Sequence, residues 1–372
     1  MLKYKKFLML LPTLAFIGLL LAGLLASVIS LKTVTSEEWT EMRNPAKILS
    51  GESTRQFTKL LNKHFVLGTT FNQIERGIQW NLTGDLGPGV RAGCGDWLFL
   101  TDELEVYPDR EKSARFRASL AELVDKRLKQ RGIKLLMVVV PDKSRIENTH
   151  LCGLNRSTLF DNRIASWLDA VKSHGVATLD LAATLAHMPG ERYYHTDTHW
   201  NEAGANAAAK AVADSLAALK WVSIISDSAV ALNPARTLRP GDLVHLAGLD
   251  GLPAFLRPKV ELAQVSKVAP IQVASDDLFG DAGLPAMALM GTSYSRNSNF
   301  APFLEHHLGE PVANVARDGG DFAGAAIAFF ESATFRSNPP RIIVWEVPER
   351  VIESPVKEAE QKWLKTLIEG KL

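Results

Sequence analysis

The chain has 372 residues, of which 46% are hydrophobic and 22% are charged, and its formal net charge is +1. This is the composition of an ordinary globular protein, long enough for one large domain or two smaller ones. A nucleic-acid-binding surface needs a clearly basic domain, so we expect no nucleic-acid partner.

The N-terminal segment 7–31 contains no charged side chain and is rich in Leu, Ala, Ile and Phe. A bilayer-spanning helix needs about 20 such residues. Lys3, Lys5 and Lys6 precede the segment, and the positive-inside rule then keeps the N-terminus cytoplasmic and places the rest of the chain outside. A cleavable signal peptide is the alternative, although its apolar region is usually only about 7–15 residues long. We predict an uncleaved anchor over residues 1–31.

The chain contains two cysteines, Cys94 and Cys152. Outside the cytoplasm, where the anchor places them, an even number of cysteines favours a disulfide. Two separate buried thiols are the alternative, and two cysteines at this spacing make a poor zinc motif. We therefore predict a Cys94–Cys152 disulfide.

Residues 32–90 show no sustained pattern apart from helical pieces such as 53–65, so they are predicted to form an irregular linker. Further along, apolar runs alternate with amphipathic stretches. The run 133–140 is apolar except for Lys134, which is typical of a strand buried on both faces of a parallel sheet. A turn and a short buried strand are also expected within 93–100. The other expected strands are 176–181, 286–290, 312–315 and 341–347, and the expected helices are 111–131, 159–174, 202–219, 299–308, 322–335 and 356–368.

Strands that alternate with helices indicate an α/β three-layer domain with a mainly parallel sheet. We place this domain over residues 91–355, followed by a C-terminal helical segment over 356–372. Residues 220–280 have little pattern and several Pro and Gly residues, so they are predicted to be an insertion. In open sheets of this kind, functional sites lie at the carboxyl ends of the strands.

Ser293 occupies such a position, in Gly291-Thr-Ser293-Tyr-Ser295 directly after the expected strand 286–290. A serine on a turn after a strand can lift its hydroxyl clear of the sheet and leave a backbone amide facing an oxyanion. Serine is a poor nucleophile unless a neighbouring base activates it, and the base needs an orienting group. Gly-x-Ser is also common in turns and caps, so the segment alone indicates little.

Asp197-Thr-His199-Trp200 supplies a carboxylate and an imidazole. In an extended segment, positions i and i+2 point to one face, so the carboxylate could approach Nδ1 of His199 and leave Nε2 for the serine. Asn201 is predicted to cap the following helix. One alternative is a loop histidine with a merely structural hydrogen bond. Another is a metal site formed by His195, Asp197 and His199, a two-histidine, one-carboxylate set. Because no further ligand cluster is visible, we predict no metal.

At these residues the sequence resembles a known family. Tyr194-His-Thr-Asp197-Thr-His199-Trp-Asn201-x-x-Gly204, followed by Gly291-Thr-Ser293-Tyr-Ser295, is similar to the AlgJ/AlgX family, the SGNH-hydrolase-like proteins of bacterial exopolysaccharide O-acetylation. Three more segments are similar in kind, namely Gly95–Phe99, Val139–Lys143 and Val344–Arg350. The resemblance extends from about residue 90 to residue 350, and a single N-terminal anchor matches the AlgJ-like members.

The resemblance implies a permuted SGNH-like domain. In this chain the Asp197/His199 motif precedes Ser293, whereas ordinary SGNH esterases have the serine first and an Asp-x-x-His pair last. It implies that Ser293 is the nucleophile, that His199 is the general base and acid, and that Asp197 orients the histidine. Oxyanion or substrate contacts are expected from the Ser293 backbone, Tyr294, Asn297 and Asn299, with Arg317 as a further candidate. A turn or surface role is the alternative for the asparagines and for Arg317.

The resemblance further implies an O-acetyltransferase anchored in the inner membrane with its catalytic domain in the periplasm. It would work without a cofactor, through an acetyl-enzyme. The acceptor would be an exopolysaccharide of the alginate or cellulose type, and a multi-pass membrane acyltransferase would supply the acetyl group. The alternatives are an acetylesterase with the same triad and a non-catalytic glycan-binding subunit of an export complex.

Overall fold

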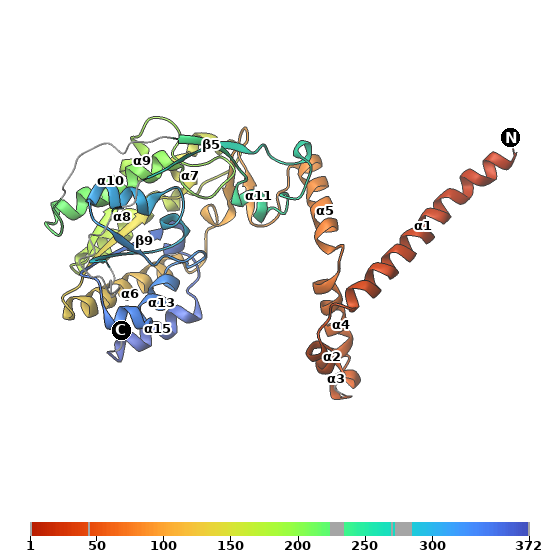
Figure 1. The fold of residues 1–372 in the computed structure, drawn as a ribbon, viewed down its shortest axis with the longest axis horizontal. Helices are drawn as coiled ribbons and strands as arrows, with labels where there is room; N and C mark the ends of the chain where they lie inside the picture. Colours follow the sequence, from red (N-terminus) through yellow and green to blue (C-terminus); the bar gives the residue numbers. More distant parts are fainter. Residues whose placement is uncertain (1, 44, 224–233, 269–270, 272–284, 371–372) are drawn as a thin grey trace, which may run out of the picture. The chain divides into compact units, whose positions relative to one another are not determined.

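The computed structural model describes residues 2–43, 45–223, 234–268, 271 and 285–370 (Figure 1). The chain forms two compact units: unit 1 is Met1–Thr83 with Gly248–Arg257, and unit 2 is Gly84–Ala247 with Pro258–Leu372. This division differs from the expected one, because the expected anchor 1–31 and most of the segment 32–90 form a single unit. The C-terminal helix belongs to unit 2 together with the sheet, and a short piece of the expected insertion belongs to unit 1.

Unit 1 is largely helical, and its helices are more regular than those of the linker or irregular helical segment that was expected over 32–90. Its helices are α1 (Leu2–Leu31), α2 (Ser36–Met42), α3 (Pro45–Leu49), α4 (Glu52–His64) and α5 (Gly68–Thr83). Of the helices after α1, only α4 was foreseen. Gly68 and Gly77 have the appearance of helix breakers, and the polar face of α5 consists mostly of Thr, Asn and Gln, so its amphipathic pattern is weak. Within α1, Pro12–Leu31 has a mean hydropathy of 2.5 and is long enough to cross a bilayer.

Unit 2 is built on a five-stranded sheet with the strand order β4-β3-β9-β7-β8. All of the pairings in this sheet are parallel. The strands are β3 (Lys134–Val140), β4 (Ala177–Asp180), β7 (Met287–Met290), β8 (Val312–Asn314) and β9 (Ile342–Pro348). The expected strands therefore form, each within one or two residues of the predicted bounds. The apolar runs of β3, β7 and β9 are buried on both faces, whereas the edge strands β4 and β8 are only partly buried.

The side chains of β3 alternate between two cores, since successive strand residues point to opposite faces. Leu135, Met137 and Val139 enter one core, and Leu136, Val138 and Val140 enter the other. The first core is covered by α6 (Arg110–Gln130), α8 (Arg163–Ser173), α13 (Gly324–Phe330), α14 (Ala333–Ser337) and α15 (Glu358–Ile368). The second is covered by α9 (Ala182–Ala186), α10 (Glu202–Ala218) and α12 (Phe300–Leu308). Figure 1 shows α10 on one side of β9 and α6, α13 and α15 on the other. The predicted three-layer α/β class is confirmed.

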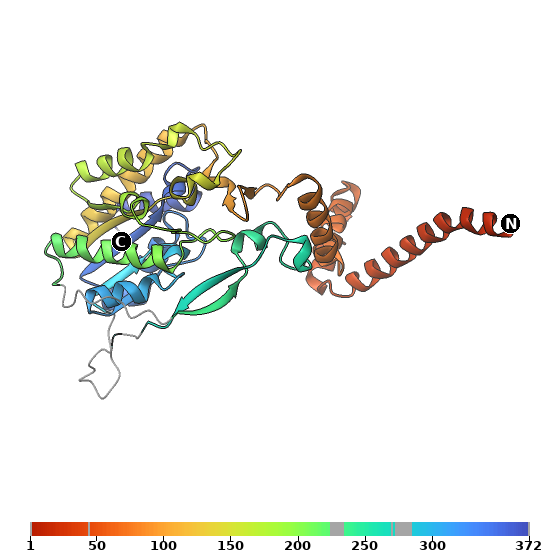
Figure 2. The same ribbon diagram turned by 90° about the horizontal axis from the view of Figure 1, so that it is seen from above.

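Two antiparallel hairpins lie outside the main sheet. β1 (Val90–Ala92) pairs with β2 (Leu98–Leu100), so the short strand expected within 93–100 is part of a hairpin and not of the central sheet. β5 (Pro234–Arg239) pairs with β6 (Glu261–Ser266), the teal ribbon in Figure 2. This second hairpin and α11 (Asp242–Leu246) come from the expected insertion 220–280, of which 224–233, 269–270 and 272–280 lie outside the described residues.

The predicted cysteine pair forms a disulfide in unit 2. Cys94 and Cys152 are 58 residues apart in the chain, and their Cα atoms are 5.5 Å apart. The amide of Cys94 also donates a hydrogen bond to the carbonyl of His150 (2.9 Å). The β1–β2 hairpin is thus tied to the segment that follows α7 (Lys143–Ile146), beside the carboxyl end of β3.

Candidate active site

The turn that carries Ser293 follows β7 and is supported by a buried carboxylate. Glu346 of β9 accepts hydrogen bonds from the amide of Thr292 (2.7 Å), the hydroxyl of Thr292 (2.9 Å) and the hydroxyl of Ser295 (2.9 Å). A Cβ atom on Gly291 would lie 2.4 Å from Oε2 of Glu346, so a side chain there would displace this carboxylate. Glycine at position 291 and glutamate at position 346 therefore hold the turn against the end of the sheet.

Ser293 begins a short 3-10 helix, η5 (Ser293–Ser295). The first N–H groups of a helical turn have no partner within the turn, so the Ser293 amide is a candidate oxyanion donor. The amide of Tyr294 instead donates to the hydroxyl of Thr292 (3.3 Å). Asn297 Nδ2 donates to the carbonyl of Ser293 (2.9 Å) and so braces the turn from its other end.

The segment that carries Asp197 and His199 is a tight loop and not the extended strand that the sequence suggested. Oδ1 of Asp197 accepts hydrogen bonds from the backbone amide of His199 (2.9 Å) and from its Nδ1 (2.7 Å). The first contact is an Asx turn, in which a short carboxylate bonds the backbone two residues further on. A bridge between Tyr193 and Trp200 closes the loop. The two-residue spacing of Asp197 and His199 thus brings the carboxylate to the imidazole through a turn.

This loop brings the three predicted residues together. Nε2 of His199 lies 2.7 Å from Oγ of Ser293, and Nδ1 lies 2.7 Å from Oδ1 of Asp197. Because the carboxylate accepts a hydrogen bond from Nδ1–H and so keeps the proton on Nδ1, Nε2 is left to accept the serine hydroxyl proton. The side chains of Asp197 and His199 are 3% and 8% exposed, whereas Ser293 is partly exposed. Of these three side chains, the hydroxyl of Ser293 is therefore the most accessible to a substrate.

Arg239 at the end of β5 holds the second oxygen of Asp197. Its Nε and Nη2 lie 3.0 Å and 2.9 Å from Oδ2 of Asp197, and Nη2 also donates to Oδ1 of Asn297 (3.4 Å). Burial opposes ionisation of Asp197, but the hydrogen bonds and charge of His199 and the charge of Arg239 hold its pKa well below the usual range. Asp197 therefore stays ionised, as an orienting carboxylate must.

A second carboxylate, Asp242 of α11, faces the same imidazole. Its Oδ2 lies 3.6 Å from Nδ1 of His199, and its Oδ1 accepts the amide of Thr198 (2.7 Å). Desolvation and the charge of Asp197 raise the pKa of Asp242. The two carboxylates are thus unequal: Asp197 makes the short contact to the imidazole, and Asp242 anchors the loop.

The metal alternative does not agree with these contacts. His195 stacks on Trp97 with ring centroids 4.4 Å apart, and its Nε2 pairs with Glu191 (2.9 Å). Among the described residues, the ligand atoms that converge within 4.8 Å belong to Asp197, His199 and Asp242. Both oxygens of Asp197 are already bonded, one of them to a guanidinium that repels cations. This arrangement suits a triad better than a metal centre.

The side chain of Lys143 holds the backbone of the loop that carries Asp197 and His199. Its fully buried Nζ donates to the carbonyls of Leu98 (2.6 Å), His195 (2.8 Å) and Asp197 (3.0 Å), and it lies 5.1 Å from the centre of the Trp97 ring. Burial lowers the pKa of Lys143 to about 8. Two of the segments that carried the family resemblance, Gly95–Phe99 and Val139–Lys143, therefore meet at the backbone of the Asp197 loop.

A separate set of ionisable side chains lies at the carboxyl ends of β3 and β9, and we call it the ionic cluster. Its members are Asp142, Arg145, Arg156, Arg163 and Glu349. Glu349 contacts all three arginines at 2.6–2.9 Å. Burial and the charge of Glu349 raise the pKa of Asp142, whereas hydrogen bonds and the charges of the arginines, acting against burial, lower the pKa of Glu349. The carboxylates of this cluster are buried, so it is structural.

Two of the predicted oxyanion or substrate residues do not have that role. The side chain of Tyr294 is fully buried, and its hydroxyl donates to the carbonyl of Thr198 (3.0 Å) while its ring packs edge-on against His199. Asn299 Nδ2 donates to Glu202 (2.6 Å) and to the carbonyl of Ser266 (2.8 Å), so it joins α10 to β6. Both donors are already engaged in packing the site together.

The remaining candidates lie beside the turn. Asn297 contacts the Ser293 carbonyl and Arg239, as described above. Arg317 follows β8, and its amide donates to the carbonyl of Gly291 (3.0 Å), which places its exposed side chain near the nucleophile turn. Arg239 and Asp242 were missed, because they belong to a stretch without hydrophobic periodicity. Their only signal was a pair of charges flanking Pro240 and Gly241.

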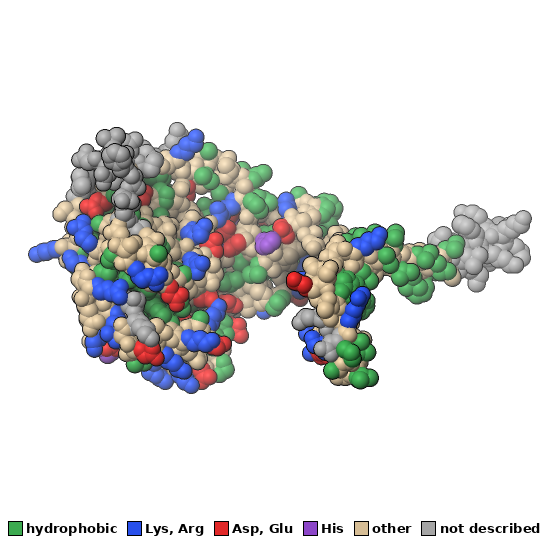
Figure 3. Space-filling model, turned by 60° about the horizontal axis from the view of Figure 1, so that its bottom comes forward, with side chains coloured by type: hydrophobic (Ala, Val, Ile, Leu, Met, Phe, Trp, Pro, Cys, Tyr) green, Lys and Arg blue, Asp and Glu red, His purple; other side chains and the backbone are tan. Residues whose placement is uncertain are grey.

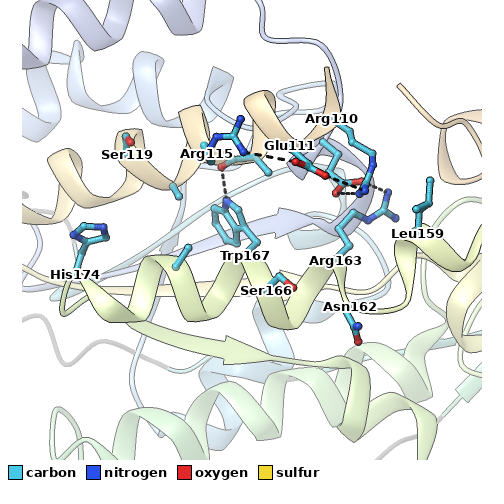
Figure 4. Close-up of a pocket in the computed structure, with 14 residues that line it drawn as sticks. Arg110, Glu111, Arg115, Ser119, Leu159, Asn162, Arg163, Ser166, Trp167 and His174 are labelled. Atoms are coloured by element: carbon cyan, nitrogen blue, oxygen red, sulfur yellow. Dashed lines mark hydrogen bonds and ion pairs between the residues drawn. The ribbon is translucent and has the colours of Figure 1, made fainter. Parts of the chain in front are cut away.

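The groove between α6 and α8 lies apart from this site (Figure 4). Its volume is about 580 Å³, and its lining includes Trp167, Arg110 and Ser166 but none of the three triad residues. Arg110 is paired with Glu353 (2.9 Å), and Trp167 Nε1 donates to the carbonyl of Ala114 (3.1 Å). No group in this lining is arranged as a nucleophile with a base, so the groove is not the candidate active site.

Comparison with known proteins agrees with this geometry. The family model of the SGNH hydrolase-like domain of acetyltransferase AlgX matches residues 90–349. The chain belongs to this family. The matched range contains the whole sheet and all three triad residues, and its bounds lie close to those expected from the sequence motifs.

Individual relatives point the same way. Probable alginate O-acetylase AlgJ of Pseudomonas aeruginosa is 28% identical over 334 residues, covering 86% of this chain and 85% of the relative. Alginate biosynthesis protein AlgX of Pseudomonas putida is 31% identical over 266 residues, covering 68% of this chain and 54% of that protein. The solved O-acetyltransferase domain of Pseudomonas putida AlgJ has a TM-score of 0.64 at 26% identity, covering 76% of this chain and 99% of that domain. The chain is therefore an SGNH-like O-acetyltransferase, which confirms the predicted family and enzyme class.

Proposed function

We propose that this O-acetyltransferase acts on an exopolysaccharide in the periplasm through an acetyl-enzyme on Ser293, with His199 as general base and acid and Asp197 as the orienting carboxylate. The observation that carries the proposal is the continuous relay from carboxylate to imidazole to hydroxyl, with both contacts at 2.7 Å. A serine held in this way is activated without a metal or a cofactor.

The reaction has two balanced halves. In the first, Oγ of Ser293 attacks the acetyl carbonyl of a donor ester, and its proton passes to Nε2 of His199. The donor alkoxide leaves with that proton, and the acetyl group remains on Ser293. In the second, a sugar hydroxyl gives its proton to Nε2 and attacks the acetyl-serine, whose oxygen is then reprotonated. The Ser293 amide would stabilise the oxyanion that forms in each half.

The proposed location and partners are supported by the N-terminal sequence of the chain and by the names of its relatives. Residues Pro12–Leu31 of α1 would anchor the enzyme in the inner membrane, and the lysines before the span favour a periplasmic catalytic unit. The relatives named above carry alginate in their names, so an alginate-type polymer is the first acceptor to test and a cellulose-type polymer the second. A multi-pass membrane acyltransferase is the proposed source of the acetyl group.

The proposal is tested with the full chain purified in detergent. p-Nitrophenyl acetate serves as donor, with oligomannuronate or cello-oligosaccharide as acceptor, and acetylated sugar is measured by mass spectrometry. We expect Ser293→Ala to lower transfer by about 10⁴-fold or more, whereas Ser166→Ala in the separate groove has no effect. Transfer that survives in Ser293→Ala would contradict the triad.

The same experiment distinguishes the acetylesterase alternative. A transferase must place the sugar so that it competes with water for the acetyl-enzyme. Release of free acetate alone, with either oligosaccharide present, would indicate an esterase or an acceptor outside these two classes. A dependence of acetyl-ester formation on one of the two oligosaccharides would identify the polymer type.

A further inference from the structure

Unit 1 carries an apolar stripe that its own fold leaves uncovered. Leu67, Phe71, Ile74, Ile78 and Leu82 follow one another at spacings of four, three, four and four residues, immediately before and along α5. These spacings place all five side chains on one face of a helix. Their exposed fractions range from 39% for Leu67 to 79% for Leu82. Water is an unfavourable surrounding for such a face, so the stripe points to an apolar partner.

The adjoining side of α5 is already occupied by unit 1 itself. Gly77 is buried against Leu252, and a Cβ atom at position 77 would lie 2.7 Å from a Leu252 methyl carbon. Asn81 Nδ2 donates to the carbonyl of Leu256 (3.0 Å). The segment Gly248–Arg257 therefore packs on α5 beside the stripe, and the stripe itself remains open.

The beginning of the stripe is fixed to the end of the apolar helix α1. The amide of Val66 donates to Oγ of Ser30 (3.0 Å), and Oγ1 of Thr33 lies 3.1 Å from Nδ1 of His64. Ser30 is fully buried in this contact. If Pro12–Leu31 crosses a bilayer, its last turn lies at the bilayer surface, and these bonds hold the start of α5 at the same level.

We propose that α5 is an interfacial helix that lies along the surface of the bilayer spanned by α1, with the stripe in the lipid. Two observations favour lipid over a protein partner. The stripe contains no charged side chain, and it begins at the residue next to the one bonded to the end of the span. The described part of α1 is itself covered with hydrophobic side chains, green in Figure 3. The inference rests on the anchor included in the proposed function.

The test uses the full chain in nanodiscs of phosphatidylcholine and phosphatidylglycerol, with single cysteines labelled by an environment-sensitive NBD fluorophore. Because the native cysteines are joined in a disulfide, they do not compete for the label. The labels are placed at Ile78→Cys on the stripe, at Asn72→Cys on the polar side of the same helix, and at Leu20→Cys within α1. Lipids with a nitroxide near the headgroup (5-doxyl) or deeper in the chain (12-doxyl) serve as quenchers.

We expect the label at position 78 to be quenched by 5-doxyl lipid at least about twofold more strongly than the label at position 72, because only the apolar face enters the interface. The label at position 20 should be quenched most by 12-doxyl lipid. Quenching at 20 but not at 78 would overturn the interfacial helix and leave the anchor intact. If the fluorescence of the label at position 78 is blue-shifted but not quenched by either lipid, the stripe contacts a protein partner, and the interfacial helix is overturned. Absence of quenching at 20 would instead contradict the anchor itself.

Discussion

Two groups of ionisable side chains lie at the carboxyl edge of the same sheet, and they differ in what they leave unpaired. In the ionic cluster, the carboxylates of Asp142 and Glu349 are buried and matched by guanidiniums. In the active site, Asp197 is matched in the same way by Arg239. There, however, the relay ends at the hydroxyl of the partly exposed Ser293, which lies 2.7 Å from Nε2 of His199. The same kind of carboxylate–guanidinium pairing therefore closes off the ionic cluster, whereas in the candidate active site it leaves the hydroxyl of Ser293 accessible, as the proposed mechanism requires.

The largest effect on activity should come from the imidazole of His199, because the candidate active site contains it and the ionic cluster does not. We expect His199→Ala to lower kcat/KM for acetyl transfer by about 10⁴-fold or more, because the serine loses its base. The melting temperature of the His199→Ala variant should stay close to that of the parent chain. The double variant with Ser293→Ala should lose no further activity, because the two residues act as one unit. Full additivity in the double variant would contradict the relay.

The next effect concerns stability and belongs to the ionic cluster. Glu349→Gln leaves the buried guanidinium of Arg163 and two partly buried guanidiniums without their shared carboxylate, and we expect it to lower the free energy of unfolding by about 3 kcal/mol or more. Thermal unfolding of the purified chain measures this as a lowered melting temperature. The matched control is Arg115→Gln, which removes an ion pair with Glu111 whose two side chains are 74% and 67% exposed and should change stability little. If the two variants lowered stability equally, the stabilising role assigned to the ionic cluster would be contradicted.

Arg239 should produce an intermediate effect on activity with a characteristic pH dependence. Arg239→Gln is expected to lower kcat/KM by about 10- to 100-fold, because Asp197 loses a charge-assisted partner. Removing a positive charge raises the pKa of Asp197, so activity should be lost at a higher pH on the acid side than in the parent chain. The stability that ionised Asp197 provides is present above its unfolded pKa, about 3.9, and is lost as the pH falls through its lower folded pKa. In the variant the folded pKa lies closer to the unfolded one, so this stabilisation is smaller and its loss is complete at a higher pH.

Arg239→Lys is the control for this positioning role. It keeps the charge beside Asp197 but not the fork of N–H donors, so it should recover most of the acid limb and only part of the rate. Two results together would show that Arg239 only contributes to packing. The pH profile of Arg239→Gln would be unchanged, and its rate would fall only in proportion to the amount of folded protein lost.

The smallest effect should come from Asp242, the second carboxylate near the imidazole. Asp242→Asn keeps an oxygen that can accept the Thr198 amide, and Asp197 still makes the short contact to Nδ1. We therefore expect kcat/KM to fall by less than about fivefold. A loss as large as that of His199→Ala would show that Asp242, and not Asp197, orients the imidazole. Steady-state kinetics of acetyl release decides between the two.

The sequence predicted those parts of the fold whose signal is local. The central strands are continuous apolar runs, and the buried sheet follows from them. The triad was predicted because Ser293, His199 and Asp197 lie in short motifs that resemble one family. Family and enzyme class were confirmed, whereas the catalytic roles of these residues remain proposals.

Other features depend on contacts between distant segments, which no local pattern encodes. Arg239 reaches Asp197 from a hairpin 42 residues away. Lys143 begins α7, shortly after the end of β3, and nothing in its sequence context indicates that it bonds three carbonyls. The loop geometry also differed, since an Asx turn and not an extended strand places the carboxylate of Asp197 on the imidazole. α5 was overlooked because its polar face carries few charges and its two glycines interrupt the helical pattern.

The most direct test of the central claim is to observe the acetyl group on the nucleophile. The full chain is incubated briefly with p-nitrophenyl acetate without acceptor, quenched in acid, digested and analysed by peptide mass spectrometry. The account predicts one acetyl group on the peptide that contains Ser293, removed on addition of the correct oligosaccharide and absent in His199→Ala. Turnover in the parent chain without any acetyl on Ser293, or with the acetyl group on another residue, would contradict it.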